Sequence, residues 1–380
     1  MEYREIGKTG KQGSIIGLGC ENLDGRPYEQ AESTIKIALD AGVNIFDVFM
    51  PGQEVRENVA RAIGNRRDEV YIQGHIGSTD INKQYDISRD LPTVKRYFED
   101  CLRIFGGYID FGMLFFIDSE EDFNKTFHGG LADYAQKLKQ NGDIGHIGFS
   151  SHRPETAIKA IETGLPEMLM FSINLAFDMT SANQYSLEAL EQGFEGANFR
   201  GLDPERAAFY TLCEKRGVGI SVMKSLGAGK LISPEHTPFS KPMSVNQCIE
   251  YALDRPAVFS ALLGCSNADE MRNTLEYIQA DATSRDYTEF LREQPNDFIG
   301  KCVYCGHCQP CPEEIDVATV TKYLDIAKLD ESAIPPSIVS HYHHLEANAE
   351  DCTECGNCEQ RCPFDVSVIH SMKEAARLFA

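Results

Sequence analysis

Residues 29–49 read EQAESTIKIALDAGVNIFDVF and contain one complete helix-to-strand unit. The first part, residues 29–43, spaces its apolar side chains along one face of a helix, and Gly42 stands where a helix ends. Residues 44–49, NIFDVF, follow as an apolar run of strand length. A helix that leads directly into a buried strand is the repeating unit of an α/β protein. This stretch therefore predicts the fold class, and the buried Asp47 within it requires a partner or a function.

The same unit recurs between residues 14 and 278. Strand candidates that are apolar on both faces lie at residues 14–20, 44–49, 70–77, 109–117, 146–152, 168–174, 219–225 and 257–265. Helical patterns separate them, for example at 91–107 and 268–278. This repeat predicts a closed (β/α)8 TIM barrel. An open doubly wound sheet is the alternative, but no glycine-rich phosphate fingerprint follows the first strand. Residues 175–204 form a long connection after the sixth strand, which we expect to cover the C-terminal face of the barrel.

The composition describes a globular chain of 380 residues with 42% hydrophobic and 25% charged residues. No apolar run approaches the roughly 20 residues of a membrane helix, and the first residues lack a signal-peptide core, so we expect a cytoplasmic protein without a membrane partner. The net charge of −22 argues against nucleic acid. This charge indicates either a solvated acidic surface or a basic protein partner.

Thirteen cysteines are many for a chain expected in a reducing compartment, where disulfides are rare. Five of them are single, and the others form two runs. The runs are Cys302-x2-Cys305-x2-Cys308-x2-Cys311-Pro312 and Cys352-x2-Cys355-x2-Cys358-x3-Cys362-Pro363. This clustering predicts metal binding or redox chemistry.

The spacing of the two runs is typical of two [4Fe–4S] clusters. Three thiolates at two-residue intervals bind one cluster, and the fourth, before proline, reaches the neighbouring cluster. One predicted ligand set is Cys302, Cys305, Cys308 and Cys362; the other is Cys352, Cys355, Cys358 and Cys311. Structural zinc and an inert loop are the alternatives, but zinc sites use two pairs of ligands. Helical residues 316–329 separate the runs, so we expect a mostly helical ferredoxin-like domain at 286–380 after a barrel domain at 1–285.

Several motifs together resemble the aldo-keto reductases, in the branch with a C-terminal two-cluster ferredoxin-type domain. They are YREIGKTG (3–10), IGLGC (16–20), NIFDVF (44–49), GHIGFSSH (145–152), VMKSLGAGKL (222–231) and GCSNADEMRNTL (264–275). The resemblance implies carbonyl reduction with a nicotinamide cofactor. In that family a tyrosine donates the proton, helped by an aspartate, a lysine and a histidine at strand ends.

This chain departs from the family's catalytic pattern. The aspartate matches Asp47, but no tyrosine follows it in residues 48–52. The lysine position holds His75, and the histidine position holds Phe115. Because general acid–base help contributes about 10²–10⁴-fold, ordinary carbonyl reduction should be impaired. Asp47 and His75, on adjacent strand ends, are expected to form a carboxylate–imidazole pair, which is either catalytic or a remnant of an ancestral site.

The nucleotide site implied by the resemblance is altered too. Ser150 and Ser151 stand where the family has a Ser-Asn pair that contacts the nicotinamide amide, and Met170 replaces the family's glutamine. Glu270 stands where NADP-preferring relatives have an arginine for the 2′-phosphate. The amides after Asn267 and the loop after the seventh strand could still bind a pyrophosphate. NADP(H) is therefore disfavoured, whereas NAD(H), a flavin or no nucleotide remain open. The predicted cofactor-contacting residues are Ser150, Ser151, Lys224, Gly227, Ser266, Asn267 and Asn273.

Three functions follow from these features. The first is an oxidoreductase that passes electrons between the two clusters and a small molecule at the barrel mouth, with Asp47 and His75 moving protons. Nicotinamides move electrons in pairs and each cluster carries one, so a flavin, a radical-tolerant substrate or a partner such as a ferredoxin must mediate. The second is a non-catalytic electron-transfer protein, and the third is a lyase or isomerase that uses Asp47 and His75. Such clusters suit an anaerobic organism.

Overall fold

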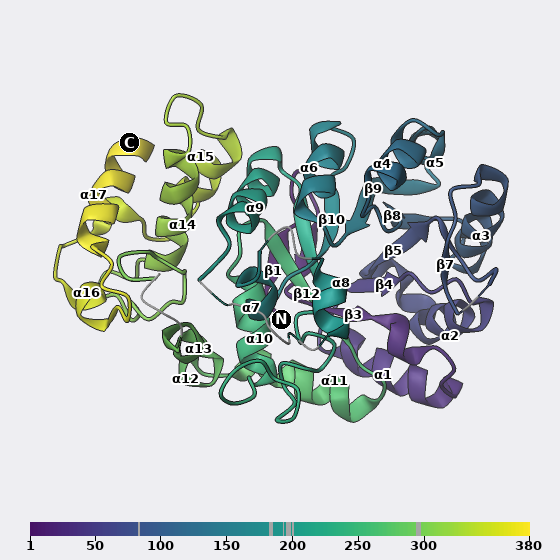
Figure 1. Ribbon diagram of the computed structural model, residues 1–380, viewed down its shortest axis with the longest axis horizontal. Helices are drawn as coiled ribbons and strands as arrows, with labels where there is room; N and C mark the ends of the chain where they lie inside the picture. Colours follow the sequence, from purple (N-terminus) through teal and green to yellow (C-terminus); the bar gives the residue numbers. More distant parts are fainter. Residues whose placement is uncertain (83, 182–184, 193, 195–198, 200, 294–297) are drawn as a thin grey trace.

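The computed structural model describes residues 1–380 except 83, 182–184, 193, 195–198, 200 and 294–297. A barrel with its outer helices forms the larger part, and the C-terminal helices α14 to α17 lie together at one side of it (Figure 1).

Eight parallel strands close the barrel and confirm the predicted architecture. In chain order they are β3 (Ile16–Gly19), β4 (Ile45–Val48), β5 (Tyr71–Ile76), β8 (Ile109–Leu114), β9 (Ile144–Ser151), β10 (Met168–Ser172), β11 (Gly219–Met223) and β12 (Val258–Gly264). Their spatial order runs from β10 through β11 and β12 to β3, then through β4, β5 and β8 to β9, which pairs with β10 again. Each predicted strand is present, and the open sheet is excluded because β12 pairs with β3.

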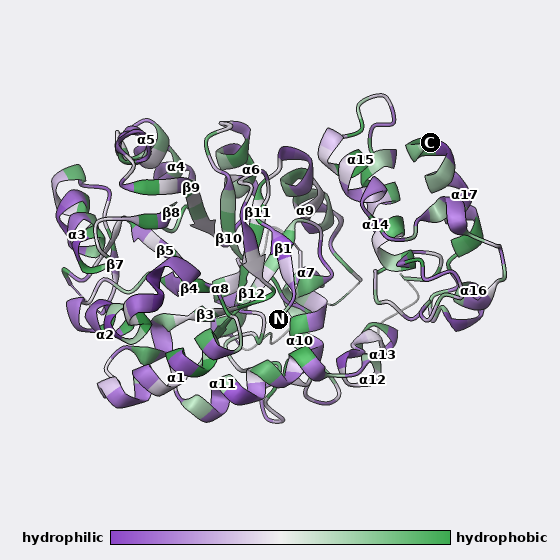
Figure 2. Cartoon of the chain, turned by 180° about the vertical axis from the view of Figure 1, so that it is seen from behind, coloured by the Kyte–Doolittle hydropathy of each residue, from purple (hydrophilic) through white to green (hydrophobic). Residues whose placement is uncertain are grey.

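The outer helices bury one apolar face each, and Figure 2 shows hydrophilic and hydrophobic residues alternating along them. They are α1 (Tyr28–Asp40), α2 (Gln53–Ile63), α3 (Leu91–Ile104), α4 (Glu120–Phe127), α5 (Leu131–Asn141), α6 (Pro154–Glu162), α9 (Pro204–Arg216), α10 (Val245–Leu253) and α11 (Ala268–Leu275). In α1 the buried stripe includes Ala31, Ile35 and Ala38. Gly42 follows this helix with φ 85°, which confirms the predicted helix end.

Small residues let the barrel interior close. A Cβ atom on Gly17 would lie 2.6 Å from Cδ2 of Leu262 and 3.1 Å from Cβ of Ile45. Leu262 and Ile45 belong to an interior cluster with Phe111, Met168 and others. The glycine therefore makes room for larger side chains from neighbouring strands, as close packing of a barrel core requires.

An antiparallel hairpin closes the N-terminal end of the barrel. It consists of β1 (Tyr3–Glu5) and β2 (Gln12–Ser14), and Ile6 after β1 is fully buried in the interior cluster. The backbone N–H of Lys8 donates to the carbonyl of Gly217, just before β11. With this end covered, the opposite end, where the strands finish, is the one left for a binding site.

The connection at residues 175–204 contains two short helices, α7 (Leu175–Asp178) and α8 (Ser186–Glu191). Hydroxyl Oγ of Ser186 lies 3.2 Å from Oγ of Ser172 at the end of β10. The described part of this connection thus contacts the C-terminal strand ends, as expected. Part of the connection that was expected to cover the barrel lies outside the described residues, namely 182–184, 193, 195–198 and 200.

Further short elements link these parts. They are β6 (Ser78–Thr79) and β7 (Asp86–Ile87), which pair with each other, and the 3-10 turns η1 (Cys20–Leu23), η2 (Gly64–Glu69), η3 (Glu276–Gln279) and η4 (Ala349–Asp351).

The C-terminal region is mostly helical, as predicted. Its helices are α12 (Ala282–Arg285), α13 (Thr288–Arg292), α14 (Val317–Lys328), α15 (Pro336–His343), α16 (Asn357–Arg361) and α17 (Val368–Phe379). The predicted boundary at 285/286 falls at the end of α12 and stays a prediction. Buried Arg255 joins the two parts because its Nη2 donates to the carbonyl of Val303 at 2.8 Å. Across the described residues, the helices are all too short or too polar to span a lipid bilayer.

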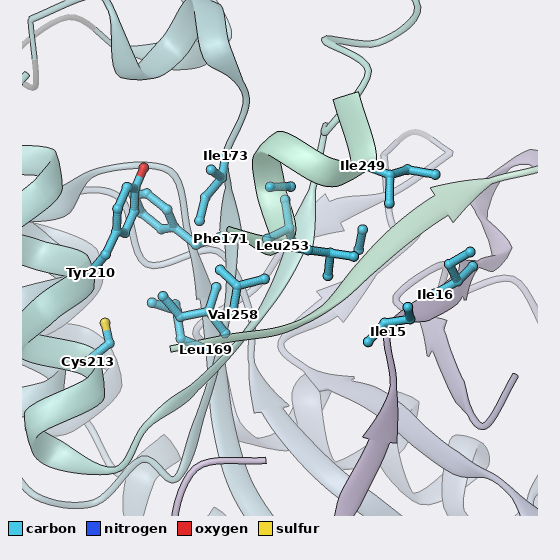
Figure 3. Packing of buried hydrophobic residues seen from close by; sticks show 14 of the residues in the cluster. Ile15, Ile16, Leu169, Phe171, Ile173, Tyr210, Cys213, Ile249, Leu253 and Val258 are labelled. Atoms are coloured by element: carbon cyan, nitrogen blue, oxygen red, sulfur yellow. The ribbon is translucent and has the colours of Figure 1, made fainter. Parts of the chain in front are cut away.

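A buried ion-pair cluster stabilises the barrel side beside α10. Asp178 accepts hydrogen bonds from Nε of Arg206 at 2.9 Å, from the Tyr210 hydroxyl at 2.5 Å and from the Tyr251 hydroxyl at 2.8 Å. Tyr210 lies next to Phe171 of β10 in the same apolar layer (Figure 3). The apolar surroundings make each charge depend on its partner.

We expect Asp178→Ala to lower the free energy of unfolding by about 3–5 kcal/mol, because the Arg206 guanidinium would remain buried without its counter-ion. Thermal and urea unfolding followed by circular dichroism would measure the loss. The control is Lys125→Ala, which breaks the exposed pair with Glu121 and should change stability by about 0.5 kcal/mol or less. Equal effects of the two substitutions would contradict the stabilising role of the buried Asp178–Arg206 pair.

Candidate functional site

A pocket of about 730 Å³ opens at the C-terminal ends of the barrel strands. Its wall is formed by residues from the ends of β3, β4, β9, β10, β11 and β12 and by the two residues after β8. The ionisable side chains in this wall are Glu21, Asp47, Tyr85, His152, Lys224, Cys265 and Glu270. Active sites of such barrels form at this face, so the pocket is the candidate active site.

Asp47 and His75 form the expected pair. Strands β4 and β5 are neighbours, and Oδ1 of Asp47 lies 2.7 Å from Nε2 of His75. Asp47 lines the pocket, whereas His75 is 1% exposed and lies behind it. Nδ1 of His75 has no hydrogen-bond partner among the described residues. The tautomer with hydrogen on Nε2 therefore fits the site, because the other would leave a buried N–H unpaired.

Aromatic rings surround this pair. The rings of Phe49 and Phe115 stack with centroids 5.8 Å apart, and both meet His75 edge-on at 6.0 Å and 5.3 Å. Tyr85 meets Phe49 edge-on at 5.3 Å. Phe115 has no polar atom that could orient a carbonyl, so Asp47 and Tyr85 are the polar side chains at this part of the wall.

A second histidine–carboxylate pair lies across the pocket wall, and the sequence interpretation missed it. His152 follows β9, and its Nδ1 lies 2.8 Å from Oδ2 of Asp118. The backbone N–H of His152 donates to Oδ1 of Asp118 at 2.7 Å, and the Tyr185 hydroxyl donates to Oδ2 at 2.7 Å. A signal existed in the sequence, because polar residues at the C-terminal end of a barrel strand commonly carry function.

Burial and neighbouring charges set the ionisation of this wall. Burial lowers the pKa of His152, with Asp118 acting in the opposite direction. Burial also lowers the pKa of Lys224, opposed by Glu21, Asp118 and Asp47. For Glu21 burial raises the pKa, and Lys224 opposes the change. Each charged form thus loses the stabilisation that hydration would give it. A neighbour of opposite charge compensates for part of that loss.

The predicted cofactor-contacting residues divide into two groups. Ser150, Lys224 and Asn273 line the pocket, and Gly227 lies beside the lining residues Ala228 and Gly229. Ser151 instead turns away, because its Oγ is buried and donates to the carbonyl of Ile117 at 2.8 Å. Ser266 and Asn267 lie at the start of α11, outside the pocket wall.

The start of α11 is occupied by its own side chains. Oδ1 of Asn267 accepts from the backbone N–H groups of Asp269 and Glu270, and Oε2 of Glu270 accepts from the N–H of Ser266 at 2.7 Å. A phosphate bound here would have to displace a carboxylate and remain beside Asp269 and Glu270. These residues do not fit a 2′-phosphate.

The cysteine runs meet in the C-terminal region. Cys308 and Cys311 line one small cavity together with Cys352, Cys355 and Cys358 of the second run. Burial, together with Asp325 and the thiols of Cys305 and Cys362, raises the pKa of Cys302 to about 12. The fourth cysteine of the first run thus lies with the first three of the second run. Eight sulfur donors in two runs are the number that two [4Fe–4S] clusters require, and the individual ligand roles stay predictions.

The sequence matches the Aldo/keto reductase family over residues 15–247 and the 4Fe-4S dicluster domain over residues 275–366. The chain therefore belongs to the aldo/keto reductase family and is an oxidoreductase of that kind with a C-terminal 4Fe–4S dicluster domain. A curated relative is the uncharacterized oxidoreductase YqkF of Bacillus subtilis, 24% identical over 323 residues, which are 79% of this chain and 99% of YqkF.

Solved structures show the same fold. Aldo-keto reductase AKR11C1 from Bacillus halodurans in its holo form superimposes with a TM-score of 0.58 at 18% identity, over 77% of this chain and 96% of that one. Its apo form gives a TM-score of 0.51 at 19% identity, over 77% and 95%. At these identities the likeness concerns the barrel fold alone.

We expect Cys355→Ala to halve the iron content of the anaerobically purified chain, from about eight to about four atoms, because one [4Fe–4S] cluster would be lost. Iron assay and electron paramagnetic resonance (EPR) after dithionite reduction would measure the change. Cys248→Ala is the matched control, since Cys248 is a buried single cysteine of α10 whose sulfur lies 4.0 Å from that of Met243. Full iron content in Cys355→Ala would contradict the assignment.

Proposed function

We propose that this chain exchanges electrons between two [4Fe–4S] clusters and a small molecule bound at the barrel mouth. The observation that carries the proposal is the pocket of about 730 Å³, which is lined by both ionisable and apolar side chains. The same chain also has a 4Fe–4S dicluster domain. Such a cavity is large enough for a drug-sized or cofactor-sized molecule.

Asp47 is the group that exchanges a proton with the bound molecule in this proposal. Its carboxylate faces the pocket, and the hydrogen bond from Nε2 of His75 fixes its orientation. His75 cannot reach the pocket itself, so we assign it a positioning role. Both residues come from strand ends, which hold them rigidly relative to the bound molecule.

The bound clusters would supply one electron at a time. We therefore propose a one-electron partner protein such as a ferredoxin, which would renew the oxidation state of the clusters. The net charge of −22 suits association with a partner that carries a basic surface. A bound flavin would be the carrier that converts between electron pairs and single electrons, and NAD(H) would exchange its hydride with that flavin, whereas NADP(H) is disfavoured because Glu270 occupies the start of α11.

Ordinary carbonyl reduction with NADPH is not the proposed activity. No tyrosine follows Asp47 in residues 48–52, and Phe115 stands in the histidine position of the family. Ser151, in the position of the family's nicotinamide-contacting asparagine, binds Asp118 and Ile117 instead. The proton donor and part of the nicotinamide site are thus absent from these positions.

We expect dithionite to reduce the clusters fully and NADPH to reduce them at least tenfold more slowly than NADH, since the carboxylate of Glu270 would repel the 2′-phosphate by more than about 1.4 kcal/mol. An anaerobic titration followed by absorbance and EPR would measure both rates. Equal reduction by the two nucleotides would contradict the proposed discrimination. A molecule that binds the pocket and is converted without any change in cluster oxidation state would favour a lyase or isomerase instead.

We expect Asp47→Asn and His75→Ala to slow the reoxidation of dithionite-reduced clusters by a quinone or aldehyde acceptor by about 10²-fold, because proton transfer in the pocket is impaired. Cluster content should be unchanged, and iron assay would verify it. The control is Asp68→Asn, which alters an exposed carboxylate before β5. Wild-type rates in both pocket variants would refute the proposed role of this pair.

A further inference from the structure

We propose that His152 is a second proton-transferring residue of the pocket, held in place by Asp118 and Tyr185. This inference rests on the proposed redox function, because it assigns a role to a residue of the same pocket. Nothing in the resemblance to the aldo-keto reductases assigns His152 such a role.

The orientation of the imidazole carries the proposal. Asp118 lies 2.8 Å from Nδ1 of His152, so this nitrogen holds the hydrogen and donates it. Nε2 then carries a free lone pair, and His152 lines the pocket. The His75 imidazole is arranged the opposite way, since its Nε2 binds Asp47 and its Nδ1 is enclosed. Of these two imidazoles, only His152 presents a basic nitrogen to a bound molecule.

Asp118 is built to hold that orientation. It also accepts from the His152 backbone N–H and from the Tyr185 hydroxyl, and Oγ of Ser151 lies 3.0 Å from its Oδ1. Burial alone would raise the pKa of Asp118, but the hydrogen bonds from His152 and Tyr185 lower it overall. The carboxylate therefore stays ionised, fixes the tautomer and stabilises the imidazolium that forms on proton uptake.

The groups that face His152 make it a base at neutral pH. Burial lowers its pKa below the ordinary value of about 6.5, Asp118 opposes this and Lys224 adds to it. Tyr185 lies edge-on to the imidazole at 6.3 Å, and the Arg153 guanidinium lies 4.3 Å from the centre of the Tyr185 ring. Phe116 packs at 4.8 Å. The ring is thus neutral at pH 7 and able to accept a proton.

The chemistry balances with two proton sites. A molecule H₂A that is oxidised to A releases two electrons and two protons. Nε2 of His152 accepts one proton, the Asp47 carboxylate accepts the other, and two oxidised molecules of the ferredoxin-type partner each accept one electron through the clusters. The reverse steps return the protons when A is reduced. The aromatic walls formed by Phe49, Phe115 and Phe116 suit an aromatic H₂A such as a hydroquinone.

Chemical labelling of the whole wild-type chain tests the orientation without turnover. Diethyl pyrocarbonate acylates neutral imidazoles at an accessible nitrogen, and peptide mass spectrometry locates the product. We expect His152 to react about 100-fold faster than His75. The reagent can reach the enclosed His75 only when the protein opens locally, and this opening costs a few kcal/mol. The pH midpoint for His152 should lie below about 6.5, and Asp118→Asn should lower it by about 1 unit because the imidazolium loses its counter-charge. Labelling of His152 no faster than His75 would overturn the proposal.

Cluster reduction by a naphthohydroquinone tests the catalytic role. We expect His152→Gln to slow this reduction about 10²-fold at pH 7, with unchanged reduction by dithionite. The matched control is His146→Gln, because His146 lies near the start of β9, the strand that leads to His152, and contacts Glu167 there. A wild-type rate in His152→Gln would overturn the proposal. A wild-type chain that reacts with dithionite but not with hydroquinone would count against the redox function, and the labelling would still decide the orientation of His152.

Discussion

Closure of the barrel between β12 and β3 is the constraint on which the rest of the structure depends. Ala261, Leu262, Leu263 and Gly264 pair with residues 16–19, and this register is possible because Gly17 leaves room for Leu262. Closure makes the C-terminal ends of all eight strands converge on one rim. Side chains more than a hundred residues apart in the sequence then share a single pocket.

Burial of charge separates structural from reactive carboxylates in this barrel. Asp178 has its oxygens occupied by Arg206, Tyr210 and Tyr251, so it stabilises the fold and has no access to the pocket. Asp118 is similarly occupied, but its partner His152 faces the pocket. Asp47 has a histidine as its partner and lines the pocket directly. In each case the hydrogen-bond partners compensate for the cost of burying the carboxylate. The role of each carboxylate then depends on whether it, or its histidine partner, faces the pocket.

The sequence predicted the barrel well because its strands are long apolar runs and its helices end at recognisable glycines such as Gly42. The Asp47–His75 contact was predictable too, since both residues end neighbouring strands. The Asp118–His152–Tyr185 group was not, because its members come from three separate loops. Side-chain alternation shows what was missed: Ser150 near the end of β9 and His152 directly after it share one face, and Ser151 lies on the other. Ser151 was expected in the pocket from the family resemblance alone, whereas His152 is the residue that lies there with Ser150.

Helix α10 links this pocket wall to the cysteine region. Its first residue, Val245, lines the pocket, and Tyr251 near its end meets Tyr287 edge-on at 5.1 Å. Arg255, just after the helix, holds the carbonyl of Val303, the residue that follows Cys302. The hydrogen bond from Arg255 is buried, so breaking it would remove a partner from a buried guanidinium and cost stability. The first cysteine run is thereby joined to the barrel by buried contacts, as the proposed exchange of electrons between the two sites requires.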